Sequence, residues 1–395
     1  MNEYTEERRP NALSYRALCA KIARGGAWPA ALMGLPLAGV ILLGKNPKTF
    51  LEFPPVTHSV EHAGFSRGAF IIAALLASGA GLALVRHLLR SRRNLRRIPP
   101  GGRFPWWGWL GFAWVACAWA LAWGRFAWAA PIQRFTFTPL WMGFIVIVNA
   151  LSYRETRRCM MLSRPAYFLL LFPVSAVFWW FFEYLNRFVQ NWYYLGVDCI
   201  SPWRYFLEAS IPFSTVLPAV LGTADWLATQ FPQPPETQAP AQSNPARSRR
   251  LPGAVLAVAA AALMGLGWRP DWLFPLVWIS PFVVITCVRQ MAGKPTVLQP
   301  WTGRTRHRLA LAALAALACG FFWEMWNCYS LAKWIYVVPY VGRFHVFEMP
   351  ILGFAGYLPF GLECAAIGQV AAEWLGEDRA HNPHSLHQTG AALCG

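Results

Sequence analysis

The amino-acid sequence predicts an all-α, polytopic integral membrane protein with about ten transmembrane helices. Its 395 residues are 56% hydrophobic and 13% charged, whereas soluble domains are about a quarter charged. Apolar runs of roughly 17 residues or more recur along the chain, which is the length that crosses a bilayer as a helix. Many of the 22 tryptophans lie near the ends of these runs, where an amphipathic ring suits the headgroup region.

The N-terminal part of the chain is predicted to be a tail followed by two helices. We expect residues 1–26 to form a cytoplasmic tail and residues 27–104 a two-helix unit. Its second helix ends in a dense cluster of arginines, which is typical of a cytoplasmic loop. A first four-helix repeat follows at 105–228, with helices predicted at 105–123, 139–151, 166–185 and 205–228.

A second four-helix repeat follows a short linker. Residues 229–250 are rich in Pro, Gln, Ser and Ala, a composition that cannot bury a core and predicts a flexible cytoplasmic linker. The second repeat spans 251–375, and a tail at 376–395 ends the chain. The helices of the second repeat are predicted at 251–267, 272–288, 309–329 and 346–375.

The basic residues predict the orientation of the helices. In this topology, 25 of the 35 Lys and Arg residues fall in the termini and in the loops on their side of the membrane. Both termini are therefore predicted on the cytoplasmic side of the inner (plasma) membrane, and the two repeats are parallel. These loops account for the net charge of +17, so we expect no nucleic-acid partner. The expected partners are the lipid bilayer and a lipophilic small molecule, and protein partners stay open.

A duplicated Glu-x-x-Asn motif is the strongest functional signal. It stands at the end of the third helix of each repeat and is followed by aromatic residues, and a further glutamate opens the next helix. The spacing of three puts Glu and Asn on one helix face. The residues are Glu183, Asn186, Trp192, Tyr194 and Glu208 in the first repeat, and Glu324, Asn327, Trp334, Tyr336 and Glu348 in the second.

We expect these groups to converge on one site near the outer leaflet, with the four glutamates as catalytic acids and bases and the other residues as the substrate-binding set. Acidic groups at membrane depth are costly and usually mark function. An uncharged carboxylic acid in a dry aromatic pocket can donate a proton to a bound molecule. Arg187 and Arg343 are predicted to bind a phosphate or carboxylate headgroup, with a salt bridge to Glu183 or Glu348 as the alternative. A role of the motif in helix packing alone also stays open.

Metal and cofactor signals are weak. His58-x-x-Glu61-His62 matches the H-x-x-E-H pattern of one zinc peptidase class, but that chemistry needs the motif on a buried helix. Here the motif follows Pro54-Pro55 in a predicted loop. The nine cysteines form no CxxC pair. We predict no cofactor and no metal site, and zinc binding stays an alternative for this motif.

One further pattern lies on an apolar stretch of the second repeat: Trp334-x-Tyr336, then Gly342, then Phe347-Glu348-x-Pro350. It resembles the membrane-integral lycopene cyclase domain family and, more loosely, other integral-membrane terpene cyclases. The resemblance covers about residues 320–365 and, less closely, 180–220. It implies small multi-helix units that are often duplicated. It also implies acidic residues that protonate a polyene or epoxide and aromatic side chains that stabilise the resulting cation.

These observations predict a membrane protein that binds or acts on a lipophilic, isoprenoid-like molecule by carboxylic acid/base chemistry. A proton-coupled transporter or lipid flippase is the first alternative, because parallel repeats with Pro-interrupted helices suit alternating access. A structural subunit that scaffolds an envelope complex is the second.

Overall fold

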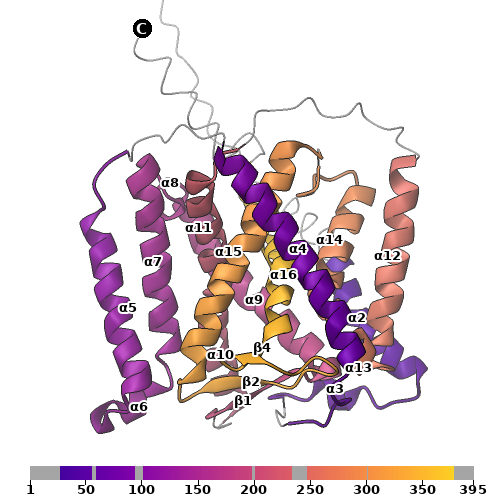
Figure 1. The fold of residues 1–395 in the computed structure, drawn as a ribbon. Helices are drawn as coiled ribbons and strands as arrows, with labels where there is room; N and C mark the ends of the chain where they lie inside the picture. The colour runs from indigo at the N-terminus through magenta and orange to yellow at the C-terminus, as the bar shows by residue number, and fades with distance from the viewer. Residues whose placement is uncertain are drawn as a thin grey trace, which may run out of the picture.

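The computed structural model describes residues 27–55, 59–93, 101–197, 201–233, 247–299 and 301–377. The chain forms a bundle of long helices, and short strands lie together at one end of it, at the bottom of Figure 1. We call this end the strand end. The predicted N-terminal tail and most of the predicted linker and C-terminal tail lie outside the described residues.

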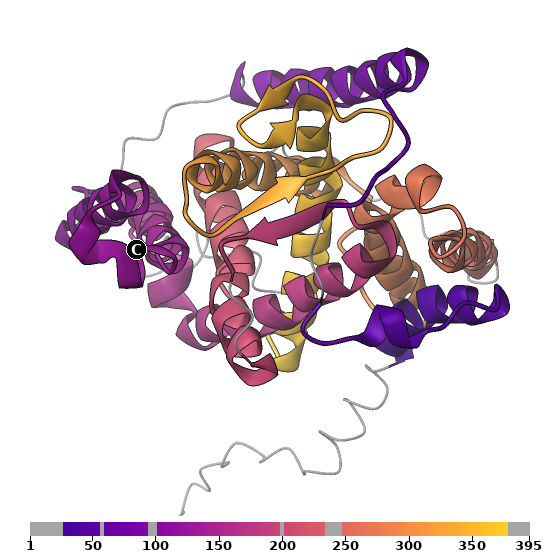
Figure 2. The same cartoon turned by 90° about the horizontal axis from the view of Figure 1, so that it is seen from below.

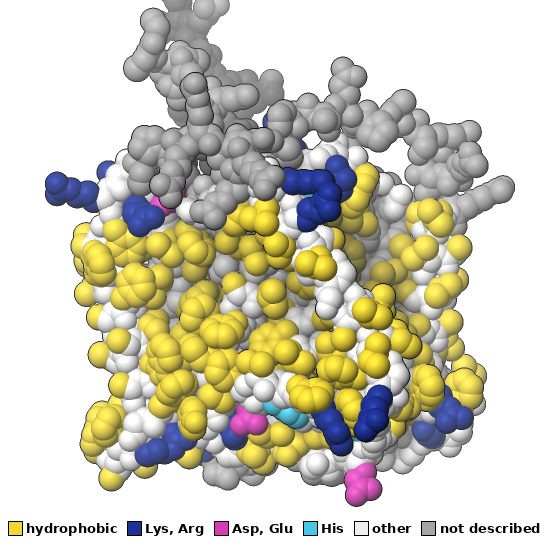
Figure 3. Space-filling model, in the orientation of Figure 1, with side chains coloured by type: hydrophobic (Ala, Val, Ile, Leu, Met, Phe, Trp, Pro, Cys, Tyr) yellow, Lys and Arg dark blue, Asp and Glu magenta, His cyan; other side chains and the backbone are white. Residues whose placement is uncertain are grey.

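The membrane class is supported by the long apolar helices. Five helices among the described residues are long and apolar enough to cross a membrane, or up to seven if each of two bent pairs is one span. A continuous band of hydrophobic side chains covers the face seen in Figure 3, between charged residues at the two ends. The structure thus confirms a mostly helical protein suited to a membrane. The predicted number of ten spans stays a prediction.

The first half of the described chain begins with two helices that lie on different faces of the bundle (Figure 2). The helix α2 (Ala27–Leu42) packs against α12 (Arg247–Gly265), and α4 (Arg67–Arg93) packs against α15 (Gly303–Cys328). The elements that follow α4 in this half are α5 (Trp106–Gly124), η1 (Ala127–Ala129), α6 (Ala130–Gln133), α7 (Phe137–Thr156), α8 (Met160–Ser163), α9 (Pro165–Val189), β1 (Trp192–Leu195), α10 (Pro202–Phe213) and α11 (Val216–Gln230). The short α3 (Lys48–Leu51) lies between α2 and α4.

The second half contains the pairs α12·α14 and α15·α16, while α5 and α7 pair in the first half. The helix α11 packs against α7, α9 and α15, so it joins the two halves. The elements of this half after α12 are α13 (Pro270–Leu273), η2 (Phe274–Trp278), α14 (Ser280–Met291), α15, β2 (Lys333–Tyr336), β3 (His345–Val346), β4 (Met349–Pro350), η3 (Ile351–Gly356) and α16 (Tyr357–Trp374).

The predicted helix at 205–228 is interrupted only at residues 214–215, where α10 meets α11 within one candidate membrane span, Pro202–Gln230. The hydroxyl group of Ser175 on α9 bridges the break: it donates to the carbonyl oxygen of Phe213 at 2.6 Å and accepts from the amide of Leu217 at 3.0 Å. Backbone polar groups inside a membrane need such partners, because no water reaches them. The sequence indicated prolines here but not the serine that stabilises the break.

The predicted helix at 346–375 is wrong at its start. Residues 345–350 form the β3–β4 hairpin, and regular α-helix begins only at Tyr357. Phe344 and Phe347 have left-handed backbone angles, with φ of 57° and 59°, and these do not fit a helix. Glu348 therefore lies in a hairpin turn rather than at the start of a helix.

The strands β1 and β2 lie in the two stretches after the motifs, where no helix is predicted, and they pair antiparallel. Trp192 lies opposite Tyr336, and Tyr194 lies opposite Trp334. The strand after α9 is thus held directly against the strand after α15. This small sheet brings the aromatic residues that follow both motifs to one place.

Candidate functional site

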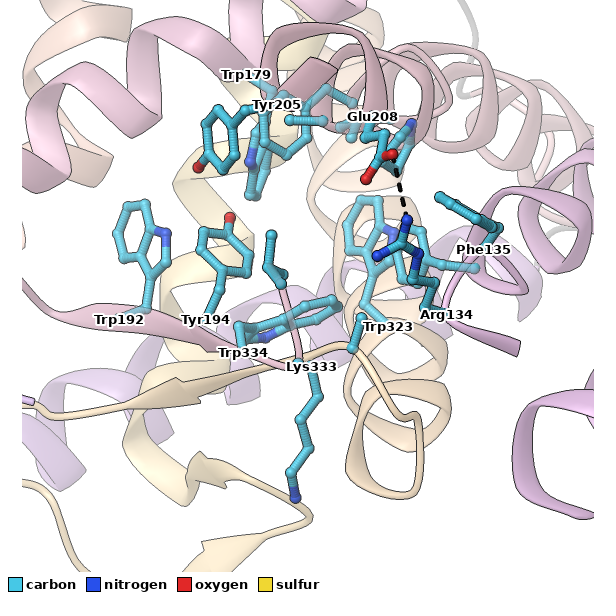
Figure 4. Close-up of a pocket in the computed structure, with 18 of the residues that line it drawn as sticks. Arg134, Phe135, Trp179, Trp192, Tyr194, Tyr205, Glu208, Trp323, Lys333 and Trp334 are labelled. Atoms are coloured by element: carbon cyan, nitrogen blue, oxygen red, sulfur yellow. Dashed lines mark hydrogen bonds and ion pairs between the residues drawn. The ribbon is translucent and has the colours of Figure 1, made fainter. Parts of the chain in front are cut away.

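A cavity of about 180 Å³ lies at the strand end, beside β1, β2 and α10 (Figure 4). We call it the aromatic pocket, because rings from both halves form most of its wall. Lipophilic ligands bind in such mostly apolar cavities with a few polar groups at fixed positions. The aromatic lining residues are Phe135, Phe137, Trp179, Trp192, Tyr194, Tyr205, Phe213, Trp278, Trp323, Trp334, Tyr336 and Tyr357.

The carboxyl group of Glu183 lies behind one wall of the aromatic pocket. Glu183 is on α9 and only 3% exposed. Its Oε1 accepts hydrogen bonds from the indole N–H groups of Trp179 and Trp192, both at 3.1 Å, and from the hydroxyl of Tyr194. All three donors line the pocket. Glu183 is therefore linked to the pocket by hydrogen bonds from three side chains of its wall.

The carboxyl group of Glu324 has the corresponding place on α15 but a different set of partners. It is fully buried, and its Oε1 accepts from the hydroxyls of Tyr336 at 2.9 Å and Tyr357 at 2.6 Å. The indole of Trp334 donates to the Tyr336 hydroxyl at 2.9 Å. Among the described residues, the second oxygen, Oε2, is buried without a hydrogen-bond partner. Tyr336 and Tyr357 both line the pocket, so one hydrogen bond links this carboxyl group to the pocket wall.

The two asparagines of the motif hold the strands rather than line the pocket. The side chain of Asn327 donates to the carbonyl of Trp334 at 2.8 Å and accepts from the amide of the same residue at 2.9 Å. Asn186 does the same for Trp192, with a donated bond of 2.8 Å, and also accepts from the amide of Asn191 at 2.8 Å. Each asparagine therefore fixes the strand that carries the aromatic residues of its half.

The pocket tyrosines on the strands are held neutral by their surroundings. Burial, followed by the nearby Glu183 carboxyl, raises the pKa of Tyr194 well above its usual value. Burial and the Glu324 carboxyl raise the pKa of Tyr336 in the same way. A neutral tyrosine can donate a hydrogen bond to a carboxyl oxygen, and both hydroxyls do so here.

The charged residues of the pocket lie at its edge. Glu208 lines the pocket on α10 and contacts Arg134 at 3.5 Å (Figure 4). It also contacts Arg204 at 2.5 Å. Lys333 also lines the pocket and pairs with Glu348 at 2.6 Å. The four glutamates therefore do not meet at one point. Glu183 and Glu324 are buried behind the rings, and Glu208 lines the pocket. Glu348 lies in the β3–β4 hairpin and pairs with Lys333 of β2.

Neither predicted headgroup arginine lines the pocket. Arg187 donates to the carbonyl oxygens of Phe50 and Glu52, so it holds the loop that follows α3. The guanidinium of Arg343 lies 4.5 Å from the ring centroid of Phe65. The basic residues that line the pocket are instead Arg134 and Lys333.

The zinc alternative for His58, Glu61 and His62 receives no support from the described residues. His62 contacts Asp271 at 2.7 Å and the carbonyl of Gln190 at 3.1 Å, so it joins the loop before α4 to both halves. His58 lies outside the described residues. Where the structure describes the chain, no group of three His, Cys, Asp or Glu side chains is placed to hold a metal ion.

Sequence reasoning missed several pocket residues. Arg134 is an isolated arginine between two predicted helices, and Trp278 lies in the predicted helix at 272–288. Tyr357 was placed inside a predicted helix, where nothing distinguished it from other apolar positions. Only the contact between α15 and α16 brings its hydroxyl to Glu324.

Comparisons of the chain with protein-family models, with curated proteins and with solved structures found no match.

Proposed function

We propose that this protein binds a lipophilic, isoprenoid-like molecule in the aromatic pocket and acts on it by carboxylic acid/base chemistry. The observation that carries the proposal is the joint wall of the pocket, in which rings from both halves are hydrogen-bonded to two buried carboxyl groups. Aromatic faces stabilise positive charge by cation–π interaction, and neutral carboxyl groups can donate protons. The resemblance to the membrane lycopene cyclases agrees with this pairing of acid and aromatic ring.

Glu324 is the proposed proton-exchanging group. Its Oε2 is buried without a partner among the described residues, whereas Oε1 is bound by Tyr336 and Tyr357. Both tyrosines line the pocket, so a proton can pass between the carboxyl group and a bound molecule through a hydroxyl. Glu183, with three donors on Oε1, is the proposed fixed charge that stabilises a cation in the pocket.

The test is a mass-spectrometric inventory of the lipids and small molecules that copurify with the protein. Ala209 lines the pocket on α10, so Ala209→Phe places a ring in the cavity. Ile211 is on the same helix but 56% exposed on the bundle surface, so Ile211→Phe is the matched control. We expect one lipophilic species to be enriched in the wild type and in the control, and lost from Ala209→Phe. The same bulk lipids in all three proteins would contradict the proposal.

The chemical step has its own test. Glu324→Gln keeps the size of the side chain and removes the exchangeable proton. We expect this variant to retain the copurifying molecule but to accumulate it unconverted. The same product in the variant and the wild type would contradict acid/base chemistry at Glu324 and favour binding alone.

We also propose the full topology: ten crossings, two parallel repeats and both termini in the cytoplasm. The strand register supports the two parallel repeats. Trp192 and Trp334 have equivalent places in the two halves, as do Tyr194 and Tyr336. Each tryptophan lies opposite the tyrosine of the other strand, as a twofold axis between the halves requires. A membrane-impermeant maleimide should label Glu61→Cys in intact cells, and Ser243→Cys only after the membrane is opened. Labelling of both in intact cells would contradict this orientation.

Proton-coupled transport or lipid flipping is the second candidate. The interruption between α10 and α11 supports it, since Pro212, Phe213 and Val216 line the pocket at this point and transporters bind cargo where a helix loses its regular hydrogen bonds. Lipid flux in reconstituted vesicles, lost in Glu208→Gln or Glu348→Gln, would favour transport over catalysis.

A further inference from the structure

We propose that Glu363 is an exchangeable proton-binding site at the centre of the membrane, separate from the aromatic pocket. Its ligand is a proton, which the carboxyl group binds and releases while the helices stay packed. Glu363 does not line the pocket. The inference goes beyond the proposed function, because it needs neither a molecule in the pocket nor chemistry at Glu324.

The depth of Glu363 is the first argument. It lies at the midpoint of the candidate membrane span Ile351–Trp374. Glu324, by contrast, is close to the end of its own span, Gly303–Cys328. An acidic group at the centre of a bilayer is costly to bury, and such groups usually mark the paths of protons and other ions. The position of Glu363 therefore points to proton binding rather than to headgroup contact.

The surroundings of the carboxyl group are the second argument. Glu363 is fully buried, and its Oε1 accepts one hydrogen bond, from the backbone amide of Phe282 at 3.3 Å. Among the described residues, Oε2 is buried without a hydrogen-bond partner, and no basic side chain pairs with the group. A carboxylate without a cationic partner is far more costly to bury than a neutral acid. Glu363 therefore holds a proton.

The helix that donates to Glu363 is the third argument, because its span is interrupted. The segments Pro270–Trp278 and Ser280–Met291 pass as one candidate span only together, and they are bent by 55° at the break. Phe282 is in the first turn of α14, so its amide is a donor that the helix itself leaves unused. Transporters place ion sites at such breaks near the middle of the membrane.

The same break leads toward the aromatic pocket. Trp278, which lines the pocket, is the last residue before the break, and Phe282 begins the contact with Glu363 shortly after it. A break frees backbone groups from the regular hydrogen bonds of a helix, and such groups can form part of a polar path. Glu363 is therefore placed where a proton can reach it without unfolding of the bundle.

The test is infrared spectroscopy of the purified full-length protein, in a detergent without ester or carboxyl groups. A neutral carboxyl group has a carbonyl band that lies apart from the bands of carboxylates and amides. Gln keeps the size of the side chain and the acceptor for Phe282, so we expect Glu363→Gln to fold and to lose the absorbance of one neutral carboxyl group. An unchanged band would overturn the proposal, because Glu363 would then be ionised in the wild type.

Two further variants secure the assignment. Glu373→Gln is the matched control, because Glu373 is on the same helix but pairs with Arg289 and is therefore charged. It should leave the neutral carboxyl band unchanged. Glu363→Asp keeps a carboxyl group in a different place, so it should move the band rather than remove it. A band that stays at the wild-type position in Glu363→Asp would overturn its assignment to Glu363.

Exchange of the proton is tested by transfer of the folded protein into D2O. We expect the Glu363 band to shift while the amide II band of the membrane helices persists, which shows exchange without unfolding. A shift that occurs only together with loss of the amide II band would overturn the exchange. Glu363 would then be a structural acceptor for the α14 amide that keeps its proton until the protein unfolds.

The kind of ion and the independence of the site have their own outcomes. Replacement of a large organic cation by Na⁺ in the buffer should leave the band unchanged, and loss of the band would overturn the assignment to a proton in favour of Na⁺. Ala209→Phe should also keep the band, because Ala209 lines the pocket and Glu363 does not. Loss of the band in this variant would overturn the separation of the two sites.

Discussion

The two halves of the molecule use the same motif differently. In the first half, Glu183 receives three hydrogen bonds on one oxygen from Trp179, Trp192 and Tyr194. In the second half, Glu324 receives two, and its other oxygen is buried without a partner among the described residues. The surroundings of the glutamate therefore differ between the two halves.

The asparagines do not differ in this way. Asn186 and Asn327 each bind the backbone of the first aromatic residue of their strand. One element of the motif is thus structural in both halves, and the other is a carboxyl group whose partners differ between them. A motif that occurs twice can combine both roles, so its double occurrence alone does not identify the reactive residue.

The largest expected effect is a difference in the stability lost by the alanine variants of the two buried glutamates. Glu183→Ala leaves three donors without their acceptor, at roughly 1–3 kcal/mol per unsatisfied buried group, so we expect a loss of about 3 kcal/mol or more. Glu324→Ala leaves two hydroxyls that can rotate toward other acceptors, so we expect about 2 kcal/mol. Thermal unfolding in detergent measures the difference.

The exposed Glu61 provides the control, because Glu61→Ala should leave the midpoint of unfolding unchanged. A larger loss in Glu324→Ala than in Glu183→Ala would break the comparison. Such a result would mean that Oε2 of Glu324 makes a stabilising contact in addition to the two hydrogen bonds that Oε1 accepts.

A second expected effect is equal in the two halves. Asn186→Ala and Asn327→Ala each remove the side chain that binds a strand backbone, so each should destabilise the protein by roughly 2 kcal/mol. Asn→Asp at either position keeps the acceptor and loses the donor, so it should have an intermediate effect. The midpoint of thermal unfolding measures this loss. If the two alanine variants lose different amounts of stability, one of the two strands is held by other contacts as well.

The sequence was sufficient for the class of protein and for the motif. Composition and long apolar runs predict a helical membrane protein, because a bilayer selects for helix length and apolarity, both of which are local properties. The spacing of Glu and Asn likewise identified both buried pairs, since three residues separate neighbours on one helix face.

The sequence was not sufficient for contacts between distant segments. The pairing of β1 with β2 and the hydrogen bond from Tyr357 to Glu324 depend on how the halves pack. Arg187 and Arg134 are both arginines close to the strand end, and only the fold decides which of them lines the pocket. The β3–β4 hairpin was missed because an apolar run that contains proline reads equally as the start of a helix.

The smallest expected effect concerns the strand tyrosines at alkaline pH. Their pKa values are raised in the folded state by burial and by Glu183 or Glu324, while unfolded tyrosine ionises near pH 10. The folded state therefore keeps protons that the unfolded state loses. The stability from this effect is complete below about pH 10 and falls as the pH rises toward the folded pKa values.

Tyr194→Phe and Tyr336→Phe test this effect in each half separately. Each variant should lose a hydrogen bond worth about 1 kcal/mol at pH 8, but its midpoint of unfolding should fall less steeply than that of the wild type between about pH 9.5 and 11. Tyr193, between the two aromatic positions of β1, faces the opposite side of the strand, so Tyr193→Phe should keep the wild-type slope. Because burial is the larger cause of the raised pKa in both halves, a reduced slope in only one half would contradict this prediction.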